Sequence, residues 1–114
     1  MTMEMLLKEK DGIHKVQIKG CIEIGDVDSF EIYLRALKSR GIRKIVVEMS
    51  EVDTIVSGAI GALMGMVDEM ESVDGNLLLL SPNSKVLTVF VRMGLDKVFR
   101  ICYDDEQVKE AMRG

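Results

Sequence analysis

Two short apolar runs with one helical pattern between them constrain the fold of this chain more than any other feature. The runs are Ile45-Val46-Val47 and Leu77-Leu78-Leu79-Leu80, and unbroken runs of this kind are typical of strands that are buried on both faces of a sheet. Between them, apolar side chains recur every three or four positions, as in an amphipathic helix: Ile60, Leu63, Met64, Val67 and Met70. The order strand, helix, strand predicts a right-handed crossover between parallel strands.

An antiparallel hairpin and a helix are predicted ahead of this unit. Met3–Lys8 and Ile13–Lys19 have the composition of two short strands, and Asp11-Gly12 between them favours a tight turn. A helix is then expected to run to about residue 40. Asp26 or Asp28 is expected to cap its start, and Glu31 would complete a capping box with Asp28. Gly41 is expected to end it. The expected buried side chains are Phe30, Leu34, Leu37 and Tyr33.

The last third of the chain predicts a helix, a short edge strand and a final helix. Ser81-Pro82 favours a helix start, because proline is tolerated at the first helical position. The expected apolar face of this helix is Val86, Leu87, Phe90 and Val91, and Gly94 ends it. Val98–Ile101 is the predicted edge strand, and Asp104 is expected to cap a last helix that buries Val108, Ala111 and Met112. The fold class is therefore α/β, one domain over residues 1–114 with a mixed sheet opened by a hairpin (β-β-α-β-α-β-α-β-α).

Composition and charge exclude several kinds of partner. A net charge of −4 without a basic run argues against binding to nucleic acid. No apolar run approaches the roughly 18 residues of a membrane span, and the charged N-terminal residues leave no signal-peptide core, so we expect a cytoplasmic protein. Cys21, Cys102 and the single His14 cannot form a metal knuckle. We expect no metal or cofactor, two cysteines acting as small buried hydrophobes, and a histidine at the surface or an edge.

The motifs of common enzymes are also missing. Ser57-Gly58 is not the nucleophile elbow of hydrolases, and His14 is the only histidine that could act as a base. A glycine-rich phosphate-binding loop is absent. A phospho-receiver is a rival, since Asp53 follows a buried strand, but such a receiver begins with a strand and a helix rather than a hairpin. The sequence therefore favours a protein that is not an enzyme.

The carboxyl end of the predicted strand 44–49 is the expected functional end of the molecule. Partners and ligands of such sheets bind beyond the carboxyl ends of the parallel strands, where residues 50–56 are expected to form a loop. Ser57 suits the N-cap of the following helix, since its hydroxyl can accept a bond from a free backbone N–H group. Small residues share one flank of this helix: Gly58, Gly61, Ala62 and Gly65. This flank either packs tightly on a neighbouring helix or leaves a shallow groove for a partner.

Several short motifs follow one family pattern through almost the whole chain. They are Gly20-Cys21-Ile22-Glu23, Glu48-Met49-Ser50, the Ser57-Gly58 helix start, Gly75 to Ser81-Pro82, and Met93-Gly94-Leu95-Asp96-Lys97-Val98-Phe99. On these residues the chain resembles a STAS domain, the module shared by anti-sigma factor antagonists and the cytoplasmic ends of sulphate transporters.

The resemblance implies a bacterial partner switch in the control of sigma-factor-dependent transcription. In such a switch, the unphosphorylated antagonist binds an anti-sigma factor that is also a serine kinase, and the sigma factor is freed. The kinase then phosphorylates the antagonist at a helix start, and the two proteins separate. A phosphate adds about −1.5 to −2 charges, which disfavour an acidic or apolar contacting surface.

The family pattern Asp-Ser-Ser-Gly or Asp-Ser-Thr-Gly, with the second hydroxyl as acceptor, can be aligned in two ways. Matching the Ser-Gly pair makes Ser57 the acceptor and places Ile55 at the aspartate. Matching the later glycines without a gap places Val56 at the aspartate, Ser57 at the first serine and Gly58 at the acceptor. Ser57 is the nearest hydroxyl in both alignments, so it is the predicted phosphorylation site, ahead of Thr54 and Ser50.

The predicted partner-binding residues lie between positions 50 and 65: Ser50, Asp53, Thr54, Val56, Ser57, Gly58, Gly61 and Gly65. The partner that the resemblance implies is a serine-kinase anti-sigma factor. An alternative is a STAS scaffold that is not phosphorylated and that assembles regulatory complexes or senses a small ligand.

Overall fold

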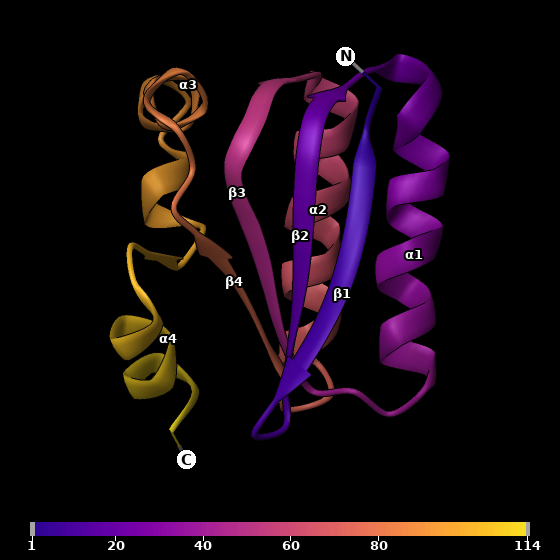
Figure 1. The fold of residues 1–114 in the computed structure, drawn as a ribbon, viewed down its shortest axis with the longest axis vertical. Coiled ribbons are helices and arrows are strands. Elements are labelled where there is room, and N and C mark those ends of the chain that lie inside the picture. The colour runs from indigo at the N-terminus through magenta and orange to yellow at the C-terminus, as the bar shows by residue number, and fades with distance from the viewer. Residues whose placement is uncertain (1, 114) are drawn as a thin grey trace.

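A five-stranded mixed sheet organises the molecule, as a computed structural model describes it for residues 2–113. The strands lie in the order β1-β2-β3-β4-β5, and the first four are labelled in Figure 1. β1 (Glu4–Lys10) and β2 (Ile13–Ile22) are antiparallel. Asp11 and Gly12 between them have φ angles of 54° and 80°, the left-handed values that a tight hairpin turn requires. The predicted hairpin is confirmed.

The other three strands continue the sheet in parallel. They are β3 (Lys44–Ile55), β4 (Asn76–Leu80) and β5 (Ile101–Cys102). The expectation that residues 50–56 form a loop is wrong, because β3 stays paired with β2 as far as Ile55, across two register shifts. The edge strand β5 is shorter than the predicted Val98–Ile101. Phe99 belongs to the preceding turn, where its N–H donates to the Leu95 carbonyl at 2.8 Å.

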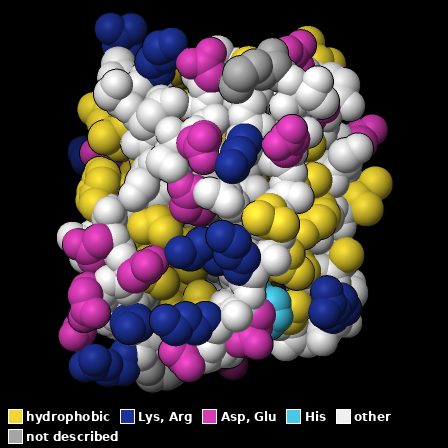
Figure 2. Space-filling view, in the orientation of Figure 1, with side chains coloured by type: hydrophobic (Ala, Val, Ile, Leu, Met, Phe, Trp, Pro, Cys, Tyr) yellow, Lys and Arg dark blue, Asp and Glu magenta, His cyan; other side chains and the backbone are white. Residues whose placement is uncertain are grey.

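Four α-helices cover the two faces of the sheet unequally within residues 2–113 (Figure 1). α1 (Val27–Ser39), α2 (Ser57–Glu71) and α3 (Ser84–Arg92) contribute to the larger core. α4 (Asp105–Met112) packs on the opposite face over β4 and β5, in a smaller apolar cluster. The remainder of that opposite face, over β1 and β2, carries mostly charged and polar side chains (Figure 2); we call it the open face, and it presents Glu4, Leu6, Lys8, Lys15, Gln17 and Lys19.

The helix starts differ in detail from those predicted. Asp26 lies at the N-cap of α1, but no side-chain cap bond forms there. Its carboxylate instead accepts the Glu23 N–H at 3.0 Å and closes the short 3-10 turn η1 (Ile24–Asp26). The predicted capping box of Asp28 and Glu31 is therefore wrong, since Asp28 already lies in the first turn of α1.

α3 (Ser84–Arg92) begins two residues later than a helix start at Pro82 predicts. Asn83 is its N-cap, and the Asn83 side chain accepts the Val86 N–H at 3.0 Å. Before it, the Ser81 N–H still donates to Cys102 of β5 at 2.8 Å. Pairing with the edge strand therefore delays the helix.

The predicted buried residues are mostly buried, with identifiable exceptions. Phe30, Leu34 and Leu37 of α1 are in the core as predicted. Val91 of α3 was expected on the apolar face and is 53% exposed, and Met64 of α2 is 36% exposed. Both lie one residue after a fully buried side chain, Phe90 and Leu63, so helix geometry turns them outward.

The cysteines and the histidine are partly as expected. Cys102 is buried, and burial raises the pKa of its thiol, which disfavours the reactive thiolate. Cys21 is half-buried rather than buried. His14 is half-buried on β2, which has a neighbour on each side in the sheet, and so it is neither an edge residue nor fully at the surface.

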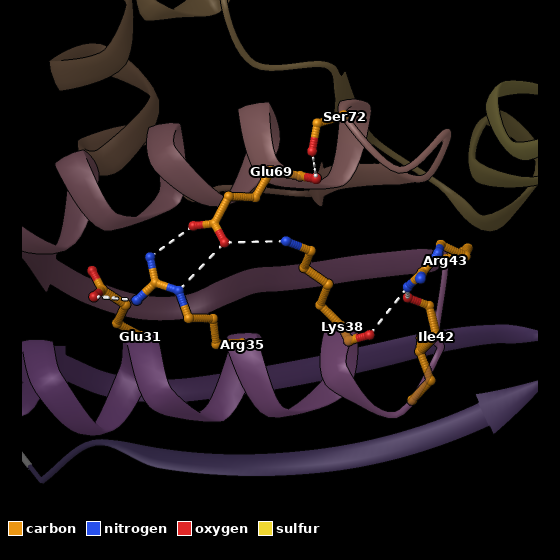
Figure 3. Close-up of polar contacts among 7 residues, drawn as sticks. All are labelled: Glu31, Arg35, Lys38, Ile42, Arg43, Glu69 and Ser72. Carbon is orange, nitrogen blue, oxygen red and sulfur yellow. Dashed lines mark hydrogen bonds and ion pairs between the residues drawn. The ribbon is translucent and has the colours of Figure 1, made fainter.

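An ion-pair network joins α1 to α2 (Figure 3). Arg35 of α1 donates to Glu69 of α2 at 2.7 Å and to Glu31 at 2.6 Å, and the Lys38 ammonium lies 3.3 Å from Glu69. The hydrogen bonds from Arg35, helped by Lys38, lower the pKa of the Glu69 carboxyl. The network links one turn of α2, at Glu69, to the second half of α1.

We expect Glu69→Gln to lower the free energy of unfolding at pH 7 by about 1 kcal/mol or less, the range of solvent-exposed ion pairs. The pKa of the Glu69 carboxyl is lower in the folded than in the unfolded chain. The stabilisation is therefore fully present above the ordinary glutamate pKa of about 4.3, and it is lost as the pH falls below that value. Urea denaturation at pH 7 and at about pH 3 measures the difference. A difference between wild type and variant that is as large at pH 3 as at pH 7 would contradict this origin.

Candidate partner-binding site

The junction between β3 and α2 is the centre of the candidate site. Val56 is extended, with φ −76° and ψ 156°, and is the N-cap of α2. Its N–H donates to Ile22 of β2 at 3.0 Å, and its carbonyl accepts the Ala59 and Ile60 N–H groups at 3.0 and 3.2 Å. The expectation that Ser57 is the N-cap is therefore wrong, because pairing with β2 makes Val56 the last extended residue.

Ser57 is consequently the first residue of the helix, and its side chain is exposed. Within the described residues, the Ser57 hydroxyl forms no hydrogen bond of its own. The first backbone N–H groups of a helix lack partners inside the helix and carry the positive end of its dipole. An anion attached to Ser57 would therefore lie in a favourable field.

Three glycines follow Ser57 on the exposed side of α2. Gly58, Gly61 and Gly65 are exposed. A Cβ atom built on Gly61 or Gly65 would meet nothing within 4 Å, while one on Gly58 would contact Val27 of α1 at 3.4 Å. Tight packing on a neighbouring helix thus does not explain Gly61 or Gly65, although Ala62 is buried. We call the exposed surface of Ser57, Gly58, Gly61 and Gly65 the α2 flank.

The remaining predicted residues, Ser50, Asp53 and Thr54, lie on β3. Thr54 is exposed and pairs with Cys21 of β2. Asp53 forms an ion pair with Lys85 of α3 at 3.0 Å. Ser50 is exposed, and together with Asp53 it lines a hollow of about 820 Å³ at this end of the sheet. The predicted site residues therefore form two groups, one around this hollow and one on the α2 flank.

Several residues that hold this region together were not predicted. The Ser50 hydroxyl donates to the carboxylate of Glu48, which is 8% exposed, and the second Glu48 oxygen is buried without a hydrogen bond from the described residues. The Asn83 side-chain amide donates to the Val52 carbonyl and so ties α3 to β3. Glu48 belongs to the Glu48-Met49-Ser50 motif and is a carboxylate next to an apolar run, but neither signal predicts its burial.

An exposed apolar residue also lies in the turn that precedes α1. Ile24 is 83% exposed, and it follows Ile22, the residue that accepts the Val56 N–H. The turn η1 contacts α2, so Ile24 belongs to the same end of the molecule as Ser57. Ile32, Val91 and Met93 are also exposed, and single exposed apolar residues are common on protein surfaces, so Ile24 alone does not mark a contact.

Two features of other kinds of site are absent from the described part of the chain. No group of three or more His, Cys, Asp or Glu side chains is placed to hold a metal ion between residues 2 and 113. Over the same residues, no helix is both long and apolar enough to cross a lipid bilayer.

Comparison with known proteins decides the family. The model of the STAS domain matches residues 4–108. The chain belongs to the STAS domain family. A Thermotoga maritima protein named "Putative anti-sigma factor antagonist" is 34% identical to this STAS domain over 74 residues, which are 65% of this chain and 63% of that protein. A Bordetella bronchiseptica protein with the same description, BtrV, is 22% identical over 97% of this chain and 96% of its own.

Solved structures confirm the fold of the STAS domain. A crystal structure from Thermotoga maritima, described as that of "a putative anti-sigma factor antagonist", has a TM-score of 0.89 at 23% identity and covers 96% of this chain and 95% of that one. SpoIIAA of Bacillus in its phosphorylated form has a TM-score of 0.73 at 18% identity, covering 95% of this chain and 99% of that one. The predicted single mixed-sheet α/β domain with an opening hairpin is confirmed.

Proposed function

We propose that this STAS domain is an anti-sigma factor antagonist that binds a serine-kinase anti-sigma factor through the α2 flank and is released when Ser57 is phosphorylated. The observation that carries the proposal is the exposed Ser57 hydroxyl at the start of α2, next to glycines that leave the helix surface bare. The relatives described as anti-sigma factor antagonists support the same role. The role is regulatory, in the cytoplasm of a bacterium, and requires no cofactor.

Each part of the surface has a distinct role in this proposal. Gly58, Gly61 and Gly65 let the backbone of a partner approach α2 closely. Thr54 and Val56 border the serine, and Ser50 and Asp53 extend the contact toward the hollow on β3.

Phosphorylation would release the partner through charge. The phosphate would be tolerated within the domain, because it lies at the positive end of α2. A closely packed partner would remove water from the phosphate, which carries about −1.5 to −2 charges, and this desolvation would weaken binding. The switch therefore needs no large change in the fold of the STAS domain.

A second candidate function follows from the residues before Ser57. Ile55 and Val56 stand where the family pattern has an aspartate, and both are apolar and half-buried. A scaffold that binds its partners constitutively, without phosphorylation, would need no aspartate at this position.

A phosphorylation assay separates the two functions. The protein is incubated with its cognate kinase-type anti-sigma factor and ATP, and the intact mass is measured. We expect a gain of about 80 Da, one phosphate, on wild type and on Thr54→Ala, and none on Ser57→Ala. Binding to the kinase without any gain in mass would remove the switch and leave the scaffold.

A further inference from the structure

A hollow lies between the hairpin turn and α4, away from the α2 flank. Its volume is about 380 Å³, within the range of small-molecule sites. Apolar side chains line its floor and lysines line its rim: Ile13 and Val108 on the floor, and Lys8, Lys10, Lys15 and Lys109 on the rim. In the lower part of Figure 2, dark blue side chains surround an apolar yellow area at this place.

The rim contains a repulsive pair of charges. Lys8 of β1 lies directly opposite Lys15 of β2, and both point to the open face. Like charges placed directly opposite each other destabilise a hairpin. At the other end of the same two strands, Glu4 lies opposite Lys19, an attractive arrangement. The concentration of lysines at the hollow is thus a local feature, in a protein whose net charge is −4.

The acidic residues near the rim neutralise these lysines only in part. Lys15 pairs with Asp105 of α4 at 3.2 Å, and Lys109 is 4.0 Å from Glu106. Among residues 2–113, Lys8 and Lys10 form no ion pair.

Two further acids of the hairpin also line the hollow. The Glu9 carboxylate accepts a hydrogen bond from the Gly12 N–H at 3.1 Å. Asp11 lies in the hairpin turn between β1 and β2. Because side chains alternate along β1, the Cβ of Glu9 lies on the face opposite to those of Lys8 and Lys10, although Glu9 borders the hollow. Lys8 and Lys10 line the hollow and, among residues 2–113, have no carboxylate within ion-pair distance.

The floor supplies an apolar surface beside these charges. Ile13 packs against the cluster beneath α4 and is half-buried, and Val108 is 4% exposed. We propose that the hollow binds a small amphipathic anion with one hydrocarbon tail, such as a medium-chain carboxylate. The acidic head would bind Lys8 and Lys10, and the tail would cover Ile13 and Val108. This proposal is independent of the proposed function.

Titration with octanoate, followed by amide NMR shifts, tests the proposal on the full chain. We expect saturable shifts confined to residues 8–15 and 105–112. Acetate has the charge without the tail, and 1-octanol has the tail without the charge, so both should bind about tenfold more weakly or worse, a difference of about 1.4 kcal/mol. Saturation by 1-octanol at the octanoate concentration, or octanoate shifts spread over the whole protein, would overturn the proposal.

Variants locate the binding to the lysines. The double variant Lys8→Gln with Lys10→Gln should weaken octanoate binding about tenfold, while Lys19→Gln, on the same face but outside the hollow, should leave it unchanged. Lys8→Glu should also weaken binding, yet raise Tm by about 1–4 °C because it pairs with Lys15 across the strands. Equal loss of binding in the Lys19 variant, or no loss in the double variant, would contradict the assignment.

Discussion

Replacing Phe90 with alanine is expected to lower the free energy of unfolding by about 3–5 kcal/mol, the cost typical of removing a buried phenyl ring. Phe90 is fully buried, and its ring centroid lies 5.2 Å from that of Phe99. It therefore joins α3 to the turn that leads into β5. Urea denaturation followed by circular dichroism measures the loss.

The neighbouring residue provides the matched control for this prediction. Val91 is 53% exposed, so Val91→Ala should change the free energy of unfolding by no more than about 0.5 kcal/mol. Similar losses in the two variants would show that the orientation of α3 is not the one described.

A large side chain at the centre of the α2 flank is expected to abolish partner binding. Gly61→Arg should weaken the affinity for the anti-sigma factor by at least about 100-fold, or about 2.7 kcal/mol, since it obstructs a close contact at the centre of the interface. The arginine has open space around its Cβ and a better helix propensity than glycine. The variant should therefore fold at least as stably as wild type.

Isothermal titration calorimetry, combined with thermal unfolding of the variant alone, separates binding from folding. Val91→Arg, an exposed substitution on α3, is the control and should bind like wild type. Unchanged affinity of Gly61→Arg would place the partner on another surface.

The periodicity of apolar residues was enough to predict most elements of the fold. The runs 45–47 and 77–80 lie in β3 and β4, and the spacing of Phe30, Leu34 and Leu37 gave the buried side of α1. These signals are local, because each element buries one stripe or one face of its own sequence.

Element ends depended on neighbours that are distant in the sequence. Residues 50–55 are polar enough to resemble a loop, yet β2 pairs with them and extends β3 to Ile55. The same pairing makes Val56, which has no capping side chain, the N-cap in place of Ser57. Pairing of Ser81 with Cys102 similarly delays α3. Contacts with distant strands, rather than local sequence preference, therefore set the end of β3 and the starts of α2 and α3.

The candidate site was predictable in part for the same reason. The glycines of α2 were visible as a small-residue flank, but only the structure shows that a Cβ atom on Gly61 or Gly65 would meet nothing within 4 Å. Burial of Glu48 beneath Ser50 depends on how the sheet is covered. The predicted hairpin already brings Lys8 near Lys15, but Lys109 joins them from α4, near the other end of the chain, and that convergence could not be predicted.

The affinity of the kinase-type anti-sigma factor for three forms of the STAS domain tests the proposed switch most directly. Calorimetry on wild type, Ser57→Ala and Ser57→Asp compares an exposed hydroxyl, its removal, and a negative charge at the start of α2. We predict that wild type and Ser57→Ala bind within about threefold of each other and that Ser57→Asp binds at least about tenfold more weakly, a loss of about 1.4 kcal/mol. Equal affinity of all three forms, or no binding by wild type, would contradict a partner switch at Ser57.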